Sequence, residues 1–203
     1  MIGNTYYDIT VKKSHFFYKQ LIDRKFCAPS LSHWSTIIDT NKTPDIRQIM
    51  QLKVLQIREN KIAAFNYKFL NGITACGKLL NKWKHNISKN CQVCGSIETH
   101  YHIIYQCSLV HNIWKTLSDM TDLAIDLKSI AFGVNNRPLN NLISQISYSI
   151  HKYWIICVNE KKLASRNSLR ELVKYDLLFK SKVMMYIGEG DISTLFQEFT
   201  DIL

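Results

Sequence analysis

The sequence predicts an all-α fold, a helical bundle-like domain that is interrupted by one small Cys/His knuckle. Glycine and proline are scarce, at 7 and 3 of 203 residues, which disfavours a turn-rich β-sandwich. Apolar residues make up 46% of the chain and recur at steps of three and four, as on one face of a helix. Three cysteines and a histidine break this helical pattern between residues 91 and 107.

The helical segments expected before the knuckle are marked by caps or by apolar periodicity. They are Thr10 to Arg24, a short turn around Trp34, a helix that starts at Thr43, Ile57 to Leu70, and Thr74 to Trp83. Thr43-Pro44-Asp45 is typical of a helix start, because it supplies a capping hydroxyl, a proline at the first helical position and an acid at the positive end. Asn71-Gly72 ends its helix, since both residues tolerate a left-handed cap.

The helical segments expected after the knuckle are longer. They are Glu98 to Gln106 across the last two ligand candidates, Ser108 to Met120, Pro138 to Leu163, a helix opened by the capping box Ser168-x-x-Glu171 and reaching Ile187, and a last helix capped by Asp191. Residues 121–137 are expected to be irregular, with a turn at 132–136. The chain is therefore divided into an N-terminal helical segment (1–42), basic helices plus the knuckle (43–120) and a C-terminal helical segment (121–203).

The cysteine segment has the spacing of a metal site. Cys91 and Cys94 lie two residues apart on one turn, and Gly95 allows backbone amides to face the sulfurs. His102 follows after seven residues and Cys107 after four more. Three thiolates and one imidazole fill the tetrahedron that Zn²⁺ prefers and leave no open position for water or substrate. We therefore expect one structural zinc in a CCHC knuckle rather than a catalytic metal.

Two other interpretations of this segment are weaker. A redox dithiol at Cys91 and Cys94 would leave Cys107 and the histidines unexplained. His100 competes with His102 for the fourth position, but on a helix it lies ~10.5 Å along the axis from Cys107, against ~7.5 Å for His102. Only the shorter gap can be closed by a distorted last turn, so we expect His100 to face solvent or to lie behind the ligands.

The charge of the chain is positive and unevenly placed. Lysine and arginine outnumber aspartate and glutamate by 26 to 16, a formal net charge of +10. Between Lys42 and Lys89 there are ten basic residues and only two acidic ones, Asp45 and Glu59. Such a field attracts polyanions, of which nucleic acids are the commonest, although a solubilising lysine face without a partner has the same composition.

The sequence lacks signals for several other classes of protein. It has no paired-aspartate polymerase signature, no Gly-rich phosphate loop and no Gly-x-Ser-x-Gly elbow, so we expect no enzyme activity from this chain. Its N-terminus has no apolar signal-peptide core, and its longest apolar run is too short to span a bilayer. We expect a protein of the cytoplasm or nucleus that is not secreted and has no membrane partner.

One block of the chain resembles a known family. From Lys68-Phe69-Leu70 through Trp83, Cys91-x-x-Cys94-Gly95, Glu98-Thr99-x-x-His102 and Cys107 to Trp114, it is similar to the zinc-binding segment after the polymerase core of non-LTR (LINE-type) retrotransposon reverse transcriptases. The flanks fit more loosely. The resemblance implies an accessory module that holds template RNA or target DNA, with reverse transcriptase or endonuclease domains of the same element as further partners.

Two functions follow from these observations. In the first, the zinc-stabilised module binds RNA or DNA through its basic face, with these candidate contacts: Arg58, Lys61, Lys78, Lys82, Trp83, Lys84 and Lys89. In the second, the zinc staples a docking surface for another protein domain, and the positive charge is incidental. A zinc enzyme is a weaker third option, because it needs an open coordination position. RNA or DNA preference and oligomeric state are not encoded in any pattern that we recognise.

Overall fold

The computed structural model describes Trp34, Ile49 and residues 51–83 and 86–203. The helix expected from Thr10 and the helix start at Thr43 lie outside the described residues. Within the described part the fold is all-α, as predicted, and its only β pairing is an isolated bridge between Asn90 and Ile97. None of the described helices is both long and apolar enough to cross a membrane.

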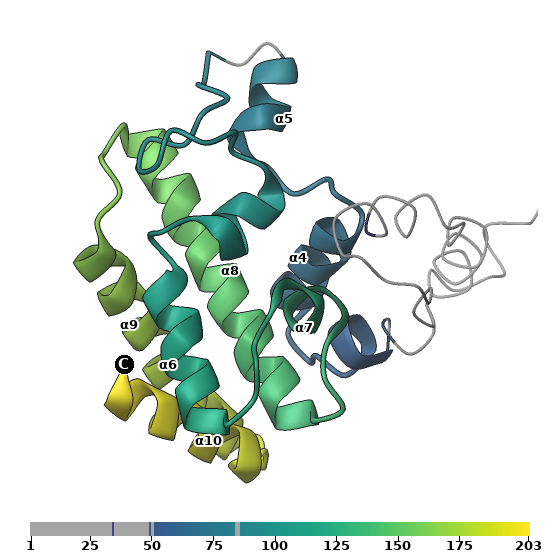
Figure 1. Cartoon of the computed structure of the whole chain (residues 1–203). Coiled ribbons are helices and arrows are strands. Elements are labelled where there is room, and N and C mark those ends of the chain that lie inside the picture. Colours follow the sequence, from purple (N-terminus) through teal and green to yellow (C-terminus); the bar gives the residue numbers. More distant parts are fainter. Residues whose placement is uncertain (1–33, 35–48, 50, 84–85) are drawn as a thin grey trace, which may run out of the picture.

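The described chain forms two π-helical turns and seven α-helices (Figure 1). In order they are η1 (Gln51–Leu55), α4 (Asn60–Leu70), α5 (Gly77–Lys82), η2 (His102–Gln106), α6 (His111–Thr121), α7 (Leu127–Phe132), α8 (Arg137–Glu160), α9 (Arg166–Tyr186) and α10 (Gly190–Ile202).

Helix α8 is the central element, and other elements pack along it on several sides. It contacts α4, α9, α10, η1 and η2. The predicted apolar stripe is buried, and several polar residues on the other faces of the helix are buried with it, as expected for a helix surrounded by neighbours. The Asn136 side chain caps its first turn by accepting a hydrogen bond from the Leu139 amide at 2.9 Å.

The C-terminal helices form a hairpin against α8 and α6. Gly188, at a φ of +80°, makes the turn between α9 and α10. Phe196 and Phe199 of α10 are fully buried, and Leu177 of α9 lies in the same hydrophobic core. This core is continuous from Phe65 of α4 to the C-terminus, so the helices on both sides of the knuckle share one interior.

Several sequence-based expectations about helix boundaries are wrong. Asp191 does not cap the last helix, because α10 begins at Gly190 and Asp191 lies inside its first turn. Residues 121–137 are not wholly irregular, because α7 forms there, capped by Asp126 through the Ser129 amide at 2.7 Å. Thr74 does not cap α5, which begins at Gly77. Ser168 is not a cap either, since α9 starts two residues earlier at Arg166.

One buried polar cluster joins α8 to the elements before α5. Lys53 of η1 is 1% exposed, and its Nζ donates to Ser144 Oγ of α8 at 2.9 Å. Asn66 Nδ2 donates to the same hydroxyl at 3.1 Å and to the Lys53 carbonyl at 2.7 Å. Burial lowers the pKa of the Lys53 amine to about 7.

Candidate metal centre

The first two ligand candidates lie on a tight turn after α5. The Asn90–Ile97 bridge closes this turn, and inside it the Cys91 amide donates to the Ser96 carbonyl at 2.8 Å. Gly95, predicted to provide conformational freedom, has a φ of +74°. The Val93 amide donates to Cys91 Sγ at 3.4 Å. The turn therefore directs the thiols of Cys91 and Cys94 toward one point, and it places the Val93 amide against the Cys91 sulfur.

The other two candidates flank a π-helical turn. The Thr99 hydroxyl starts this helical segment by accepting from the His102 amide at 3.1 Å. His102 is the first residue of η2 and Cys107 follows its last, and the Cys107 amide donates to the His102 carbonyl five residues back at 2.9 Å. A π turn is wider than an α turn, so it brings the two side chains together. The π turn is thus the distorted last turn that we expected between His102 and Cys107.

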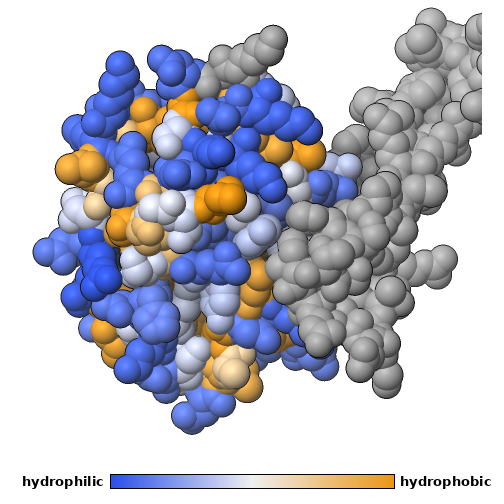
Figure 2. All heavy atoms as spheres, turned by 45° about the horizontal axis from the view of Figure 1, so that its top comes forward, coloured by the Kyte–Doolittle hydropathy of each residue, from blue (hydrophilic) through white to orange (hydrophobic). Residues whose placement is uncertain are grey.

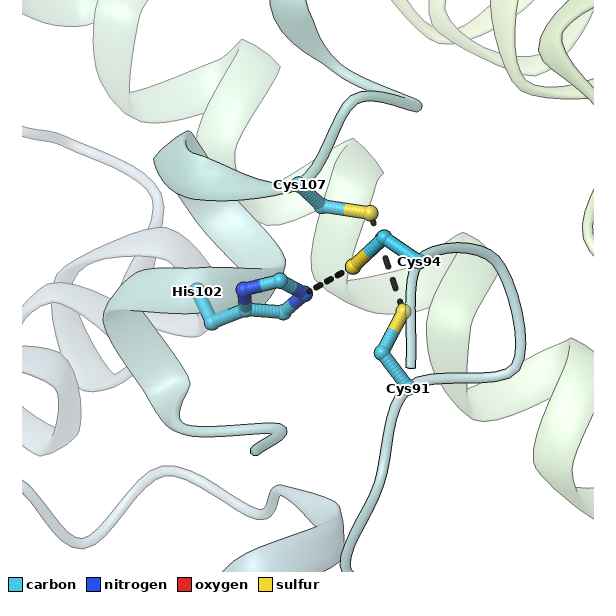
Figure 3. A group of neighbouring side chains, drawn as sticks. All are labelled: Cys91, Cys94, His102 and Cys107. Atoms are coloured by element: carbon cyan, nitrogen blue, oxygen red, sulfur yellow. Dashed lines mark hydrogen bonds between the residues drawn. The ribbon is translucent and has the colours of Figure 1, made fainter. Parts of the chain in front are cut away.

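The structure brings these four side chains together (Figure 3). Their ligand atoms all lie within 4.8 Å of one another. Cys91 Sγ and Cys107 Sγ are 3.7 Å apart, and Cys94 Sγ and His102 Nε2 are 3.3 Å apart. Tetrahedral zinc with Zn–S near 2.3 Å and Zn–N near 2.0 Å requires edges of ~3.8 and ~3.5 Å. These two edges match a tetrahedral zinc ion, and all four donors lie close enough together to share one ion.

The protonation chemistry of the site also fits a divalent cation. Burial and, to a smaller extent, the neighbouring Cys91 raise the pKa of the Cys107 thiol to about 12. Burial also raises the pKa of Cys91 and lowers that of His102, which keeps the imidazole neutral. Without a cation the buried sulfurs would stay protonated, whereas zinc stabilises the thiolates that it binds. All four positions are filled by protein atoms, so the site is structural.

His100 does not face solvent as the sequence suggested. It is 6% exposed, and its ring packs edge-on against Trp34, Phe69 and Tyr101 at centroid distances of 5.9, 5.5 and 5.2 Å. It lies on the α-helical turn before η2, on the side facing the core. The aromatic cluster therefore anchors the helical segment that carries His102.

A second anchor holds η2 from the other side. Trp114 of α6 is 3% exposed, and its indole N–H donates to the Ile104 carbonyl at 2.7 Å. Because η2 ends at Gln106, this carbonyl lies in the last helical turn, where carbonyls lack an intrahelical donor. Trp114 is thus a core anchor.

Sequence reasoning missed the residues that join α5 to the metal segment. The buried Glu98 side chain accepts from the Gly77 amide at 3.1 Å, and the Glu98 carbonyl accepts from the Lys78 amide at 3.0 Å. A Cβ on Gly77 would lie 2.6 Å from the Ser88 carbonyl oxygen, so only glycine fits. The Glu98 carboxylate thus caps the start of α5. The sequence signal for this contact was a glycine at the first residue of a helix.

The predicted nucleic-acid contacts fall into two groups. Lys78, Lys82 and Lys89 are exposed on or just after α5, and Trp83 at the end of α5 is 54% exposed. We call these four residues the α5–knuckle surface. Figure 2 turns the top of Figure 1, where α5 lies, towards the viewer, and hydrophilic residues dominate that face. Lys84 lies outside the described residues.

Arg58 and Lys61 do not belong to this surface. Arg58 forms an ion pair with Glu189, which also binds Arg137 at the first residue of α8, both at 2.8 Å. The knuckle instead packs near Trp154 and Val158 in the last turns of α8. At 1.5 Å per residue these ends of α8 are ~25 Å apart. Lys61, exposed on the first turn of α4, follows Glu59, which pairs with Lys180 of α9.

The fold and the site together define a helical protein with one closed, structural zinc centre. Residues 30–114 match the family model described as zinc-binding in reverse transcriptase. The resemblance indicated by the sequence is thereby confirmed for this segment, which contains all four ligand candidates. No curated protein and no solved structure matches the chain.

Proposed function

We propose that the zinc module binds nucleic acid through the α5–knuckle surface. The observation that carries this proposal is the absence of competing carboxylates. Between Glu59 and Asp119 the sequence has seven lysines and a single acidic residue, Glu98. Glu98 is 7% exposed and its carboxylate faces the start of α5. A phosphate backbone approaching this stretch therefore meets lysines without an exposed carboxylate from the same stretch, and Glu160, at the end of α8 near the knuckle, is paired with Lys162.

Trp83 adds a contact of a different kind. An indole that is 54% exposed beside Lys82 can stack on an unpaired base, which is worth ~1–3 kcal/mol per base in single-strand binding proteins. The zinc has an indirect role, because it fixes the turn that follows α5 and carries Lys89. Loss of the metal should therefore weaken binding even though no ligand side chain contacts nucleic acid.

The experiment is a fluorescence-anisotropy titration with structured RNA, single-stranded DNA and duplex DNA. We compare the parent chain with Lys78→Glu/Lys82→Glu, Trp83→Ala and Cys94→Ser. Lys115→Glu/Lys128→Glu, at exposed positions on α6 and α7, is the control with the same change in net charge. The proposal predicts strong weakening by the α5 pair, a small effect of the control pair and a loss specific to single strands for Trp83→Ala.

Salt dependence provides an independent readout. If two phosphates are neutralised by Lys78 and Lys82, the slope of log K against log salt should fall in magnitude by about 1.4–1.8 in the double variant. Equal weakening by the α5 pair and the control pair would indicate that only net charge matters. Absence of binding, or binding that is unchanged between about 50 and 200 mM salt, would refute the proposal.

A second candidate function is protein docking, with the other domains of the same element as partners. The observation that favours it is an apolar groove between the knuckle and α8, lined by residues that include Ile87, Val93, Leu109 and Val158. If none of the three nucleic acids binds, Val93→Glu becomes the informative variant. It should abolish association with a separately produced polymerase domain while leaving zinc content unchanged.

A further inference from the structure

Helix α9 has two apolar faces, of which only one is used within the described part of the chain. Its inner face packs Leu169, Val173 and Leu177 against α8 and α10, all at 0% exposed. Its outer face carries large apolar side chains in solvent, including Tyr175 at 68% exposed and Tyr186 at 92%. A contiguous exposed apolar patch often marks an interaction surface, whereas single exposed apolar residues do not.

The exposed residues of the outer face have the spacing of a coiled-coil seam, and Tyr175, Leu178 and Met185 are its apolar members. Six exposed residues recur at alternating steps of three and four, and we call them the α9 seam: Ser168, Glu171, Tyr175, Leu178, Lys182 and Met185. Steps of three and four average 3.5 residues, the repeat that keeps a seam facing a partner helix. Phe179, at 56% exposed, and Tyr186 widen the seam on one flank.

The charges of the seam select the partner and its direction. Because the spacing reads the same in both directions, a two-fold axis between Asp176 and Leu177 places Tyr175 opposite Leu178 of the partner subunit. The same axis places Glu171 opposite Lys182 of the partner subunit, twice in the dimer. Parallel pairing would instead put like charges opposite each other. Neither Glu171 nor Lys182 joins an ion pair elsewhere in the described structure.

We propose that a second copy of this chain packs antiparallel on the α9 seam to form a two-fold symmetric dimer. The seam carries one acid and one base, so it lacks the positive field that a nucleic acid requires. The exposed aromatic residues supply a large part of the required contact. Tyr175, Phe179 and Tyr186 are each more than half exposed, aromatic side chains bury ~150–250 Å² each, and a standard interface needs ~800 Å² per partner.

The test is the oligomeric state of the full zinc-loaded chain, measured by sedimentation velocity from about 1 to 100 μM, where interfaces of this size can dissociate. The parent chain should dimerise. Glu171→Lys and Lys182→Glu should each weaken the dimer by about tenfold or more, because each swap creates two like-charge contacts. The double swap should restore the dissociation constant to within about threefold of the parent. Asp119→Lys, at an exposed position on α6, is the control and should change nothing.

Because these substitutions are at exposed positions, the circular dichroism spectrum should not change. A parent chain that is monomeric throughout this concentration range overturns the proposal. If the single swaps leave the dissociation constant of the dimer unchanged, the assignment to the α9 seam is wrong. Failure of the double swap to rescue overturns the antiparallel register.

Discussion

The zinc knuckle and the C-terminal helices are held in place by different forces. Among residues 86–97, which form the turn of the knuckle, only Cys91 is buried. Residues 190–202 form α10, which buries Ile192, Phe196 and Phe199. Ordering a 12-residue turn costs roughly 12–24 kcal/mol of backbone entropy, whereas one buried side chain contributes ~1.5–3 kcal/mol.

This difference in burial indicates that the metal is needed to hold the knuckle and not the C-terminal helices. A structural zinc contributes ~10–16 kcal/mol of binding free energy in small zinc modules, which is the right size to order such a turn. The hairpin of α9 and α10 needs no such cross-link, because its apolar faces meet α8 and α6. We therefore expect the two regions to respond differently to metal removal and to core substitutions.

Metal removal should have the largest effect, and it should be local. When zinc is removed by a chelator, we expect amide hydrogen exchange to speed up strongly across residues 86–107. The amides of α8 and α10 should keep most of their protection, because their burial does not depend on the ligands. Uniform loss of protection along the whole chain would show that the two regions are not separable.

A core truncation should produce the opposite pattern. Phe199→Ala removes a fully buried ring from α10 and should lower the free energy of unfolding by about 3–5 kcal/mol. The variant should still hold one zinc per chain. Glu198→Ala, next to it but exposed, should change stability by less than about 0.5 kcal/mol. Loss of zinc from Phe199→Ala would contradict the view that the knuckle and the C-terminal helices are stabilised separately.

The buried amine of Lys53 should give stability a specific dependence on pH. Its folded pKa, about 7, lies below the ordinary 10.5, so between these values the unfolded chain binds more protons. The free energy of unfolding should therefore rise with pH across this window, by up to about 1.4 kcal/mol per pH unit. Lys53→Met should flatten the rise in urea unfolding curves. Lys61→Met, at an exposed position of α4, is the control and should leave the rise unchanged. If the free energy of unfolding depends on pH in the same way in all three proteins, Lys53 does not have this role.

The smallest effect is expected from Arg58, despite its place among the sequence-based candidates. Its guanidinium already pairs with Glu189, ~25 Å along α8 from the knuckle, which exceeds the ~10 Å Debye length at 0.1 M salt. Arg58→Ala should change affinity for RNA by less than about twofold. A loss as large as that of Lys78→Glu/Lys82→Glu would mean that the basic surface extends along α8.

Much of this architecture could be predicted from the sequence, and the reason differs from element to element. The ligand set follows from spacing, because Cys91 and Cys94 share one turn and geometry favours His102 over His100. Helix α8 follows from a long apolar stripe after Pro138. The left-handed residues Gly72, Gly95 and Gly133 lie at turns that the sequence indicated.

The remaining features depend on contacts between residues that are distant in sequence. Helix α7 has six residues, too few for a periodic signal, and is stabilised by burial of Ile130 and Phe132. The burial of Lys53 depends on Ser144, 91 residues away. The contiguous basic face that the sequence suggested is divided, because charge counted along the chain does not report which end of α8 each residue reaches.

The central claim is that Cys91, Cys94, His102 and Cys107 share one zinc ion, and the most direct measurement is the metal content of the purified chain. We predict one zinc per parent chain by mass spectrometry, with the thiol of Cys94, which is otherwise exposed, protected from alkylation until the metal is removed. Cys107→Ser should bind zinc more weakly by well over the ~10–100-fold typical for loss of an outer-sphere partner, whereas Cys157→Ser should leave the stoichiometry at one. A folded, metal-free parent chain in which Cys94 reacts freely would contradict the account.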